Sequence, residues 1–274
     1  MYPNEIIFGM DLYAILLLVG VIVCMVFIRI LSDRRGMRAK WFNFCLYTAI
    51  GAVTVGYGGA VLLQSFYNWL AGKPEASGAT FYGGLIGGVL LFVAVYFGLG
   101  HFLFPDGYHI KNFRVASDIA APCITVAHGF GRLGCLMAGC CHGPKCDAWY
   151  GIVMNGVKRL PVQLFEAIFL FALSGVTFVL FWKGKKYLMP LYMSAYGVWR
   201  IIAEILRDDY RGGVQGFALT PSQVISILLI AGGILVFVLE WLWDRSRARR
   251  AVSAEVAVDV AADEVGYDEK TEEN

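Results

Sequence analysis

A stretch of fifteen residues near the middle of the chain, residues 128–142, combines residue types that could do chemistry. It reads HGFGRLGCLMAGCCH and holds one arginine, three cysteines and four glycines. The stretch ends an apolar segment, where an isolated arginine at membrane depth costs at least ~2.5 kcal/mol. We therefore expect Arg132 to face protein, water or a ligand rather than lipid, and the cysteines offer nucleophiles or soft metal ligands.

A second group of polar residues recurs at helical spacing. Tyr196, Arg200, Glu204 and Arg207 are separated by four, four and three residues, which places them on one face of a helix. Taken alone, they could form a structural ion pair between Arg200 and Glu204. With Arg132 at the same level, positive charge is left over, and the planar guanidinium suits phosphate oxygens. The combination indicates a site for an anionic phospholipid headgroup.

Glycine runs accompany both groups. The run FYGGLIGG contains Gly83 and Gly84, and Gly131 lies next to Arg132. Glycine lets a helix or a bulky substrate approach the backbone closely. Helix packing alone would explain either run, and Tyr82 and Tyr196 could equally be aromatic residues of the membrane interface.

Composition decides which elements position these residues. The chain has 274 residues, a mean hydropathy of +0.62 and 16% charged residues, against roughly 25% in soluble globular proteins. Seven apolar stretches approach the ~20 residues of a spanning helix: residues 10–30, 42–70, 81–104, 115–139, 163–182, 188–206 and 219–243. These features predict an all-α polytopic membrane protein with seven transmembrane helices in one domain, residues 1–250. Residues 251–274 form an acidic tail that we expect to be disordered and cytoplasmic.

Charge predicts the orientation. The loops after the first, third, fifth and seventh stretches hold 13 Lys and Arg residues, and the other loops hold 6. The positive-inside rule then places the N-terminus outside and the C-terminus in the cytoplasm. In that orientation polar groups from six helices gather just below the outer surface. Beside the residues named above, they are Asp11, Tyr13, Glu166, Ser222 and Gln223.

Four sequence stretches carry a family resemblance. They are YGGLIGG from Tyr82, GRLGCLMAGCCHG from Gly131, RLPVQLFEA from Arg159, and YGVWRIIAEILRDD from Tyr196 followed by SQ at Ser222. The chain resembles the prolipoprotein diacylglyceryl transferases, seven-helix enzymes that move diacylglycerol from phosphatidylglycerol to a cysteine of a lipoprotein precursor. The predicted catalytic residues are Arg132, Arg200, Tyr82, Glu204, His142 and Cys140. The predicted substrate-binding residues are Arg207, Gly83, Gly84, Gly131, Gly143, Tyr196 and Cys135.

The resemblance implies displacement at the glycerol carbon that bears the phosphate ester, with glycerol phosphate leaving. Arg132, Arg200 and Arg207 would hold the phosphodiester and stabilise charge on the leaving oxygen. The donor is phosphatidylglycerol or a similar anionic phospholipid, and the acceptor is a prolipoprotein or another thiol. No metal, other cofactor or nucleic acid is expected. The implied location is the bacterial cytoplasmic (inner) membrane, with a site that faces the outer leaflet.

Two departures from the family pattern concern thiol activation. The histidine that usually precedes GGLIG is Tyr82 here, and an asparagine and a glutamate of the signature are replaced by Cys135 and Cys140. A tyrosine with its ordinary pKa of ~10 is a poor base at neutral pH. The field of the arginines could activate the acceptor instead, or His128 or His142 could serve as the base. Of these two, His142 is the better placed in the sequence.

The clustered cysteines admit three interpretations. Cys140 or Cys141 could form a disulfide with Cys146 on the oxidising outer side. Cys135, Cys140, Cys141 and Cys146 could bind zinc with His142, although the spacing is not that of common zinc modules. Cys140 or Cys141 could also be a covalent relay or a redox group.

Three functions compete with the lipoprotein transferase. The first is a paralogous transferase with the same donor and a different acceptor. The second is a protein that binds or moves phospholipid without breaking a bond. The third is a thiol-redox membrane protein, which predicts that Cys140→Ser and Cys141→Ser abolish activity while Arg132→Ala does not.

Overall fold

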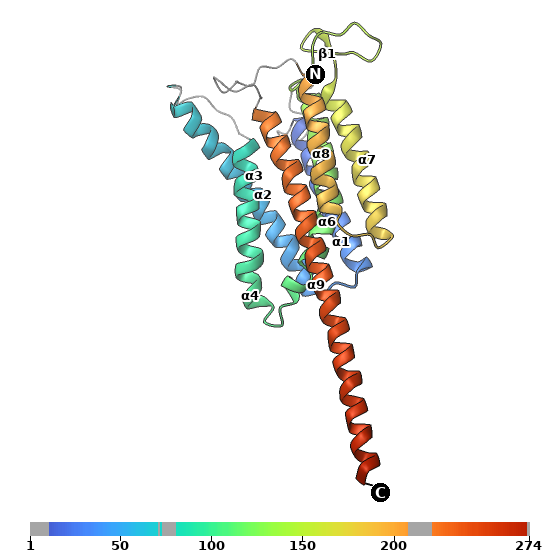
Figure 1. The fold of residues 1–274 in the computed structure, drawn as a ribbon. Helices are drawn as coiled ribbons and strands as arrows, with labels where there is room; N and C mark the ends of the chain where they lie inside the picture. The colour runs from blue at the N-terminus through green and yellow to red at the C-terminus, as the bar shows by residue number, and fades with distance from the viewer. Residues whose placement is uncertain (1–10, 71, 73–80, 208–220, 273–274) are drawn as a thin grey trace.

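The computed structural model describes residues 11–70, 72, 81–207 and 221–272. Helices dominate this part of the chain, and one short hairpin joins two of them (Figure 1). The elements in order are α1 Leu12–Arg34, α2 Ala39–Leu70, α3 Phe81–Ala94, the π-helix η1 Val95–Leu99, α4 Gly100–Leu103, α5 Tyr108–Lys111, α6 Phe113–Ala138, β1 Ile152–Met154, β2 Val157–Arg159, α7 Val162–Trp182, α8 Leu188–Ile205 and α9 Pro221–Glu272.

Six helical segments of the described chain are long and apolar enough to cross a membrane: Leu12–Arg34, Ala39–Leu70, Ile86–Leu103, Phe113–Ala138, Val162–Trp182 and Ser222–Arg249. The prediction of an all-α, multi-pass membrane protein is therefore confirmed. The remaining predicted span corresponds to α8, whose 18 residues include Arg200 and Glu204. These charged side chains lower its hydropathy, so α8 does not qualify by composition alone.

Helix α6 holds the centre of the bundle and packs against α1, α7 and α8 (Figure 1). Its glycines allow this close approach. A Cβ atom on Gly129 would lie 2.8 Å from the ring of Phe171 in α7, and one on Gly134 would lie 2.7 Å from the ring of Tyr13 in α1. Real Cβ contacts are longer than this, so a larger residue at either position would push the helices apart.

Helices α2 and α3 form a separate pair that runs side by side in Figure 1. Glycines of both helices meet at their interface. A Cβ atom on Gly56 would lie 2.8 Å from the carbonyl oxygen of Gly84, and a Cβ atom on Gly59 would lie 2.7 Å from that of Gly83. The structure thus places Gly83 and Gly84 in a helix–helix contact, which is the packing explanation that the sequence left open.

The hairpin of β1 and β2 covers the C-terminal end of α6. Its two strands are antiparallel and turn at Asn155 and Gly156, with φ of 51° and 77°. Two positive φ angles are typical of a tight type I′ turn, for which Asn-Gly is favoured. The side chain of Asn155 donates a hydrogen bond to the carbonyl oxygen of Gly139 at 3.3 Å. The hairpin therefore anchors the loop that follows α6.

The C-terminal region differs from its sequence expectation. Instead of a disordered tail after residue 250, α9 continues as one helix to Glu272 and extends beyond the bundle (Figure 1). Residues 251–274 are rich in Ala and Glu, which have high helix propensity. The acidic composition pointed to disorder, while the local propensity allows the spanning helix to continue.

Candidate active site

An ion pair joins α6 to α7 at the hairpin end of the bundle. The Nε atom of Arg132 lies 3.1 Å from Oε1 of Glu166, and the Glu166 side chain is only 1% exposed. A carboxylate this deeply buried requires a charged partner. The second oxygen of Glu166, Oε2, is also buried and accepts no hydrogen bond from the described residues. Glu166 therefore both orients Arg132 and keeps one acceptor for another group.

Tyr196 of α8 extends this pair to a third helix. Its hydroxyl donates a hydrogen bond to Oε1 of Glu166 at 2.9 Å. The same hydroxyl lies 3.5 Å from Nε2 of His128, one turn before Arg132 on α6. The rings of His128 and Tyr196 contact each other edge to face, with centroids 4.9 Å apart. The buried face of α8 is thus fixed against α6 and α7 by polar contacts.

Arg200 lies one turn further along α8. Its Nη2 atom is 3.2 Å from Oε2 of Glu204 and donates a hydrogen bond to Oγ of Ser222 on α9 at 2.9 Å. The ion pair with Glu204 is the one that the four-residue spacing predicted. The other terminal nitrogen, Nη1, is buried and has no hydrogen-bond partner among the described residues. A buried guanidinium nitrogen without a partner is costly unless a ligand fills the place.

The two arginines share one neighbourhood. Both guanidinium groups lie within electrostatic range of Tyr196 and His128. Each has one carboxylate, so the surplus of positive charge is smaller than the sequence suggested. Arg207 follows α8 and adds a third guanidinium at this end of the bundle.

A cluster of three thiols adjoins the arginines. The sulfur atoms of Cys135, Cys140 and Cys141 all lie within 4.8 Å of one another. The thiols of Cys135 and Cys140, and after them the guanidinium of Arg207, lower the pKa of Cys141 well below its ordinary value. All seven cysteines of the chain lie in the described residues, and no disulfide joins any two of them. The disulfide to Cys146 that the sequence suggested is therefore not formed in the structure.

Two glycines and a glutamine hold the loop after α6. A Cβ atom on Gly143 would lie 2.7 Å from the carbonyl oxygen of Leu206, and the Gly143 amide donates to the carbonyl oxygen of Leu160 at 2.9 Å. The buried side-chain amide of Gln163 donates to the carbonyl oxygen of Cys140. Gly143 thus has a packing role, and Gly139 ends α6 in a left-handed conformation with φ of 70°.

Most of the predicted site residues meet at this end of the bundle. Those brought together are Arg132, Cys135, Cys140, Tyr196, Arg200, Glu204 and Arg207. A Cβ atom on Gly131 would make only an ordinary contact, 3.7 Å from the side chain of Leu17. The side chain of Tyr82 lies outside the described residues.

The two histidines lie in different surroundings. His142 Nδ1 lies 3.3 Å from the carbonyl oxygen of Gly143 in its own loop, whereas His128 contacts Tyr196 within the polar centre. Glu166 and Ser222 were expected at the same level as Arg132 but were not among the predicted site residues. Their signals were their positions at the start of a predicted span and in the stretches RLPVQLFEA and SQ, whereas their partners lie on other helices and cannot be read from the sequence.

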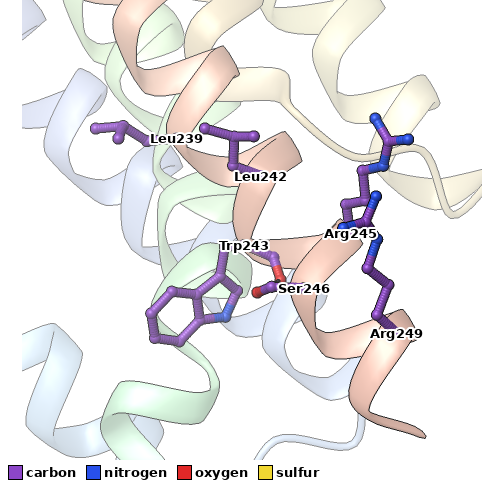
Figure 2. Close-up of a pocket in the computed structure, with 6 residues that line it drawn as sticks. All are labelled: Leu239, Leu242, Trp243, Arg245, Ser246 and Arg249. Atoms are coloured by element: carbon purple, nitrogen blue, oxygen red, sulfur yellow. Dashed lines mark hydrogen bonds between the residues drawn. The ribbon is translucent and has the colours of Figure 1, made fainter. Parts of the chain in front are cut away.

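Two cavities lie at the opposite end of the bundle. One, of about 550 Å³, runs along α9 and is lined by Leu239, Leu242, Trp243, Arg245, Ser246 and Arg249. Figure 2 shows Arg245 and Arg249 on the same side of α9, with the Trp243 ring on the other. The second, of about 450 Å³, lies between the ends of α1 and α7 and includes Arg34 and Arg35. Neither cavity reaches the centre around Arg132.

Comparison with known proteins gives one consistent result. The family model described as prolipoprotein diacylglyceryl transferase matches residues 5–239. A phosphatidylglycerol–prolipoprotein diacylglyceryl transferase 2 of Clostridium perfringens is 31% identical over 254 residues, which cover 84% of this chain and 92% of the relative. A transferase of Clostridium tetani is 30% identical over 255 residues, 84% of this chain and 94% of the relative. A transferase of Legionella pneumophila strain Corby is 30% identical over 218 residues, which cover 73% of this chain and 77% of the relative.

Proposed function

Because the chain belongs to the prolipoprotein diacylglyceryl transferase family, we propose that it transfers the diacylglyceryl group of phosphatidylglycerol to the thiol of a lipobox cysteine in a prolipoprotein. The relatives carry the donor and the acceptor in their names. The observation that carries the proposal is that Arg132 and Arg200 are both largely buried although they come from two different helices. Both lie near the hydrogen bond between Tyr196 and Glu166.

The reaction displaces a phosphate ester from carbon. The acceptor sulfur attacks the glycerol carbon, the bond from that carbon to the ester oxygen breaks, and glycerol phosphate leaves with the electron pair. The leaving phosphate gains negative charge as the bond breaks. Donors that are already fixed at that oxygen stabilise the transition state more than the ground state.

Arg200 supports this role through its unused nitrogen. Its Nη2 is held by Glu204 and Ser222, which leaves the buried Nη1 to bind a phosphate oxygen. Arg132 is held in the same manner by Glu166. A guanidinium fixed by one carboxylate keeps further N–H donors for a ligand, and it loses less entropy when the ligand binds.

The distribution of basic residues in the loops and the character of α8 support a position for the site in the membrane. We propose seven transmembrane helices, with α8 as the seventh span, because it buries Tyr196 and Gly197 against its neighbours and exposes the apolar residues Val198, Ile202 and Ile205. The basic loops lie at the end opposite to Arg132, which supports a cytoplasmic assignment for that end and an outer-leaflet position for the site. The membrane is then the bacterial cytoplasmic membrane, where phosphatidylglycerol and prolipoproteins meet.

Complementation tests the proposal. The chain is expressed in bacteria depleted of their own prolipoprotein transferase, and lipidated lipoprotein is measured. We expect rescue by the natural chain and by Arg29→Ala, which removes an exposed arginine paired with Asp33. We expect no rescue by Arg132→Ala or Arg200→Ala.

An assay with purified components separates the competing functions. Phosphatidylglycerol and a lipobox peptide should yield a thioether-linked peptide and free glycerol phosphate. Release of glycerol phosphate only with another thiol would indicate a paralogous acceptor. Lipid binding without any release would indicate a non-catalytic protein, and activity that survives Arg132→Ala but not Cys140→Ser would indicate thiol-redox chemistry.

A further inference from the structure

The thiol cluster at the end of α6 is built by the backbone. Gly139 follows the helix in the left-handed conformation, and the amide of Cys140 donates to the carbonyl oxygen of Cys135 at 3.1 Å while that of Gly139 donates to Leu136. This pair of bonds is a Schellman motif, which brings the side chains at the positions of Cys135 and Cys140 into contact. The motif explains why two cysteines five residues apart meet.

The third thiol reaches the cluster by an unusual backbone conformation. Cys141 has a φ of 64°, in the left-handed region that non-glycine residues rarely adopt. Such a conformation persists only where surrounding contacts determine it. The buried Gln163 holds the carbonyl group of Cys140, and Asn155 of the hairpin holds that of Gly139. The loop therefore directs Cys141 toward Cys135 and Cys140.

We propose that Cys135, Cys140 and Cys141 bind one Zn²⁺ ion, and that the fourth coordination position takes the thiol of the acceptor cysteine. Thiolates are preferred ligands of Zn²⁺, with Zn–S distances of ~2.3 Å and sulfur atoms ~3.8 Å apart in a tetrahedral site. The three sulfur atoms already lie within 4.8 Å of one another. Small side-chain rotations are enough to close the site.

The number of ligands favours an open site. In the part of the chain that the structure describes, no fourth Cys, His, Asp or Glu joins this cluster. Structural zinc sites have four protein ligands, whereas catalytic sites have three and keep one position for water or substrate. Cys140 is exposed, so an acceptor can approach from the surface.

The charges around the cluster suit an anionic metal site. Three thiolates and Zn²⁺ carry a net charge of −1, and a fourth thiolate makes it −2. The guanidinium of Arg207 lies within hydrogen-bonding reach of Cys141, and that of Arg132 lies within electrostatic range of Cys135. These two cations offset part of the negative charge of the site, and they are themselves two of the proposed phosphate-binding arginines.

The inference rests on the proposed function and supplies its missing activation step. A thiol that coordinates zinc is deprotonated, and here its proton passes to water outside the membrane. The bound sulfur attacks the glycerol carbon, the bond from that carbon to the ester oxygen breaks, and the electron pair leaves with glycerol phosphate. The product is a thioether, which is a weaker ligand than a thiolate and dissociates. The metal thereby deprotonates the acceptor thiol, a step for which a tyrosine such as Tyr82, with an ordinary pKa of ~10, is a poor base.

Metal analysis of the full chain, purified in detergent, tests the site. We expect about one zinc ion per chain, and its loss in the variant with Cys135→Ser, Cys140→Ser and Cys141→Ser. Cys146→Ser, in the same loop but outside the cluster, should keep the ion. If the triple variant does not fold, the zinc content of the single variant Cys140→Ser is measured instead, because Cys140 is exposed and its replacement should not disturb the fold. We expect this variant to lose the ion as well. A reduced natural chain that takes up no Zn²⁺ overturns the inference.

Substitution with Co²⁺ tests the fourth position. A lipobox peptide with one cysteine should change the cobalt–thiolate absorption, and the same peptide with serine should not. An unchanged spectrum with the cysteine peptide overturns the assignment of the acceptor position. Arg132→Ala should keep the cobalt response and lose transfer.

Activity separates this inference from the proposed function. We expect chelation to slow transfer at least ~100-fold, and Zn²⁺ to restore it. Undiminished transfer by the chelated chain or by the Cys140→Ser variant overturns the inference and leaves the proposed function standing. A chain that binds zinc and the peptide thiol but never releases glycerol phosphate from phosphatidylglycerol overturns the proposed function instead.

Discussion

Arg132 of α6 and Glu166 of α7 face each other across a helix interface, with 3.1 Å between Nε and Oε1 and side chains that are 15% and 1% exposed. Removing one partner of a buried ion pair leaves an uncompensated charge and costs about 3–5 kcal/mol. We therefore expect two separable roles, one of the pair in holding the helices together and one of Arg132 in binding the donor phosphate. The predictions below use this separation.

We predict that Arg132→Ala lowers both stability and transfer, by about 3 kcal/mol and at least ~100-fold. The double variant Arg132→Ala with Glu166→Gln removes both charges, so it should recover most of the stability but none of the transfer. Denaturation in detergent and the rate of thioether formation measure the two effects. Recovery of transfer in the double variant would show that Arg132 is only structural.

Replacement of Arg200 by lysine should reveal the use of its second nitrogen. Lysine keeps the charge but loses the planar fork, so we expect at least ~10-fold weaker binding of phosphatidylglycerol. Ser222→Ala removes only the hydrogen bond to Nη2, worth about 0.5–1.5 kcal/mol, and should have a smaller effect. The KM for phosphatidylglycerol in mixed micelles measures both. Equal effects of the two variants would contradict a role for Nη1.

Tyr196→Phe tests the contact that joins three helices. The substitution keeps the ring against His128 but removes the hydrogen bond to Glu166. A hydrogen bond to a charged group is worth about 1.5–3 kcal/mol, so we expect transfer to fall ~10–100-fold. Thermal unfolding should change less than in Arg132→Ala, because the ion pair remains. A variant with full activity would show that this hydroxyl does not position Glu166.

The glycines of α3 should behave as packing residues. A Cβ atom on Gly83 would lie 2.8 Å from Cβ of Leu63 and would meet the backbone of Gly59. Gly83→Ala should therefore destabilise the α2–α3 pair by about 1–3 kcal/mol. Gly58→Ala, on α2 with open space around it, is the matched control and should be neutral or stabilising by up to about 1 kcal/mol. Loss of transfer without loss of stability in Gly83→Ala would point to direct substrate contact.

The sequence determined the features that depend on local spacing and composition. Hydropathy gave the spanning segments, and the four-residue interval gave the ion pair between Arg200 and Glu204, because residues four apart on a helix are neighbours whatever surrounds them. Charge and span order also gave a common depth for Arg132, Glu166 and Ser222.

Only the tertiary structure decided which of the polar side chains expected at this level contact one another. The contact of Arg132 with Glu166 depends on how α6 and α7 are rotated about their axes, and a hydropathy profile carries no information about that rotation. The same holds for Gly83, which the motif suggested for substrate and the structure places against α2. The meeting of Cys141 with Cys135 depends on a left-handed residue after the helix. These contacts join residues through packing between elements, and packing is specified by the whole fold rather than by any one segment.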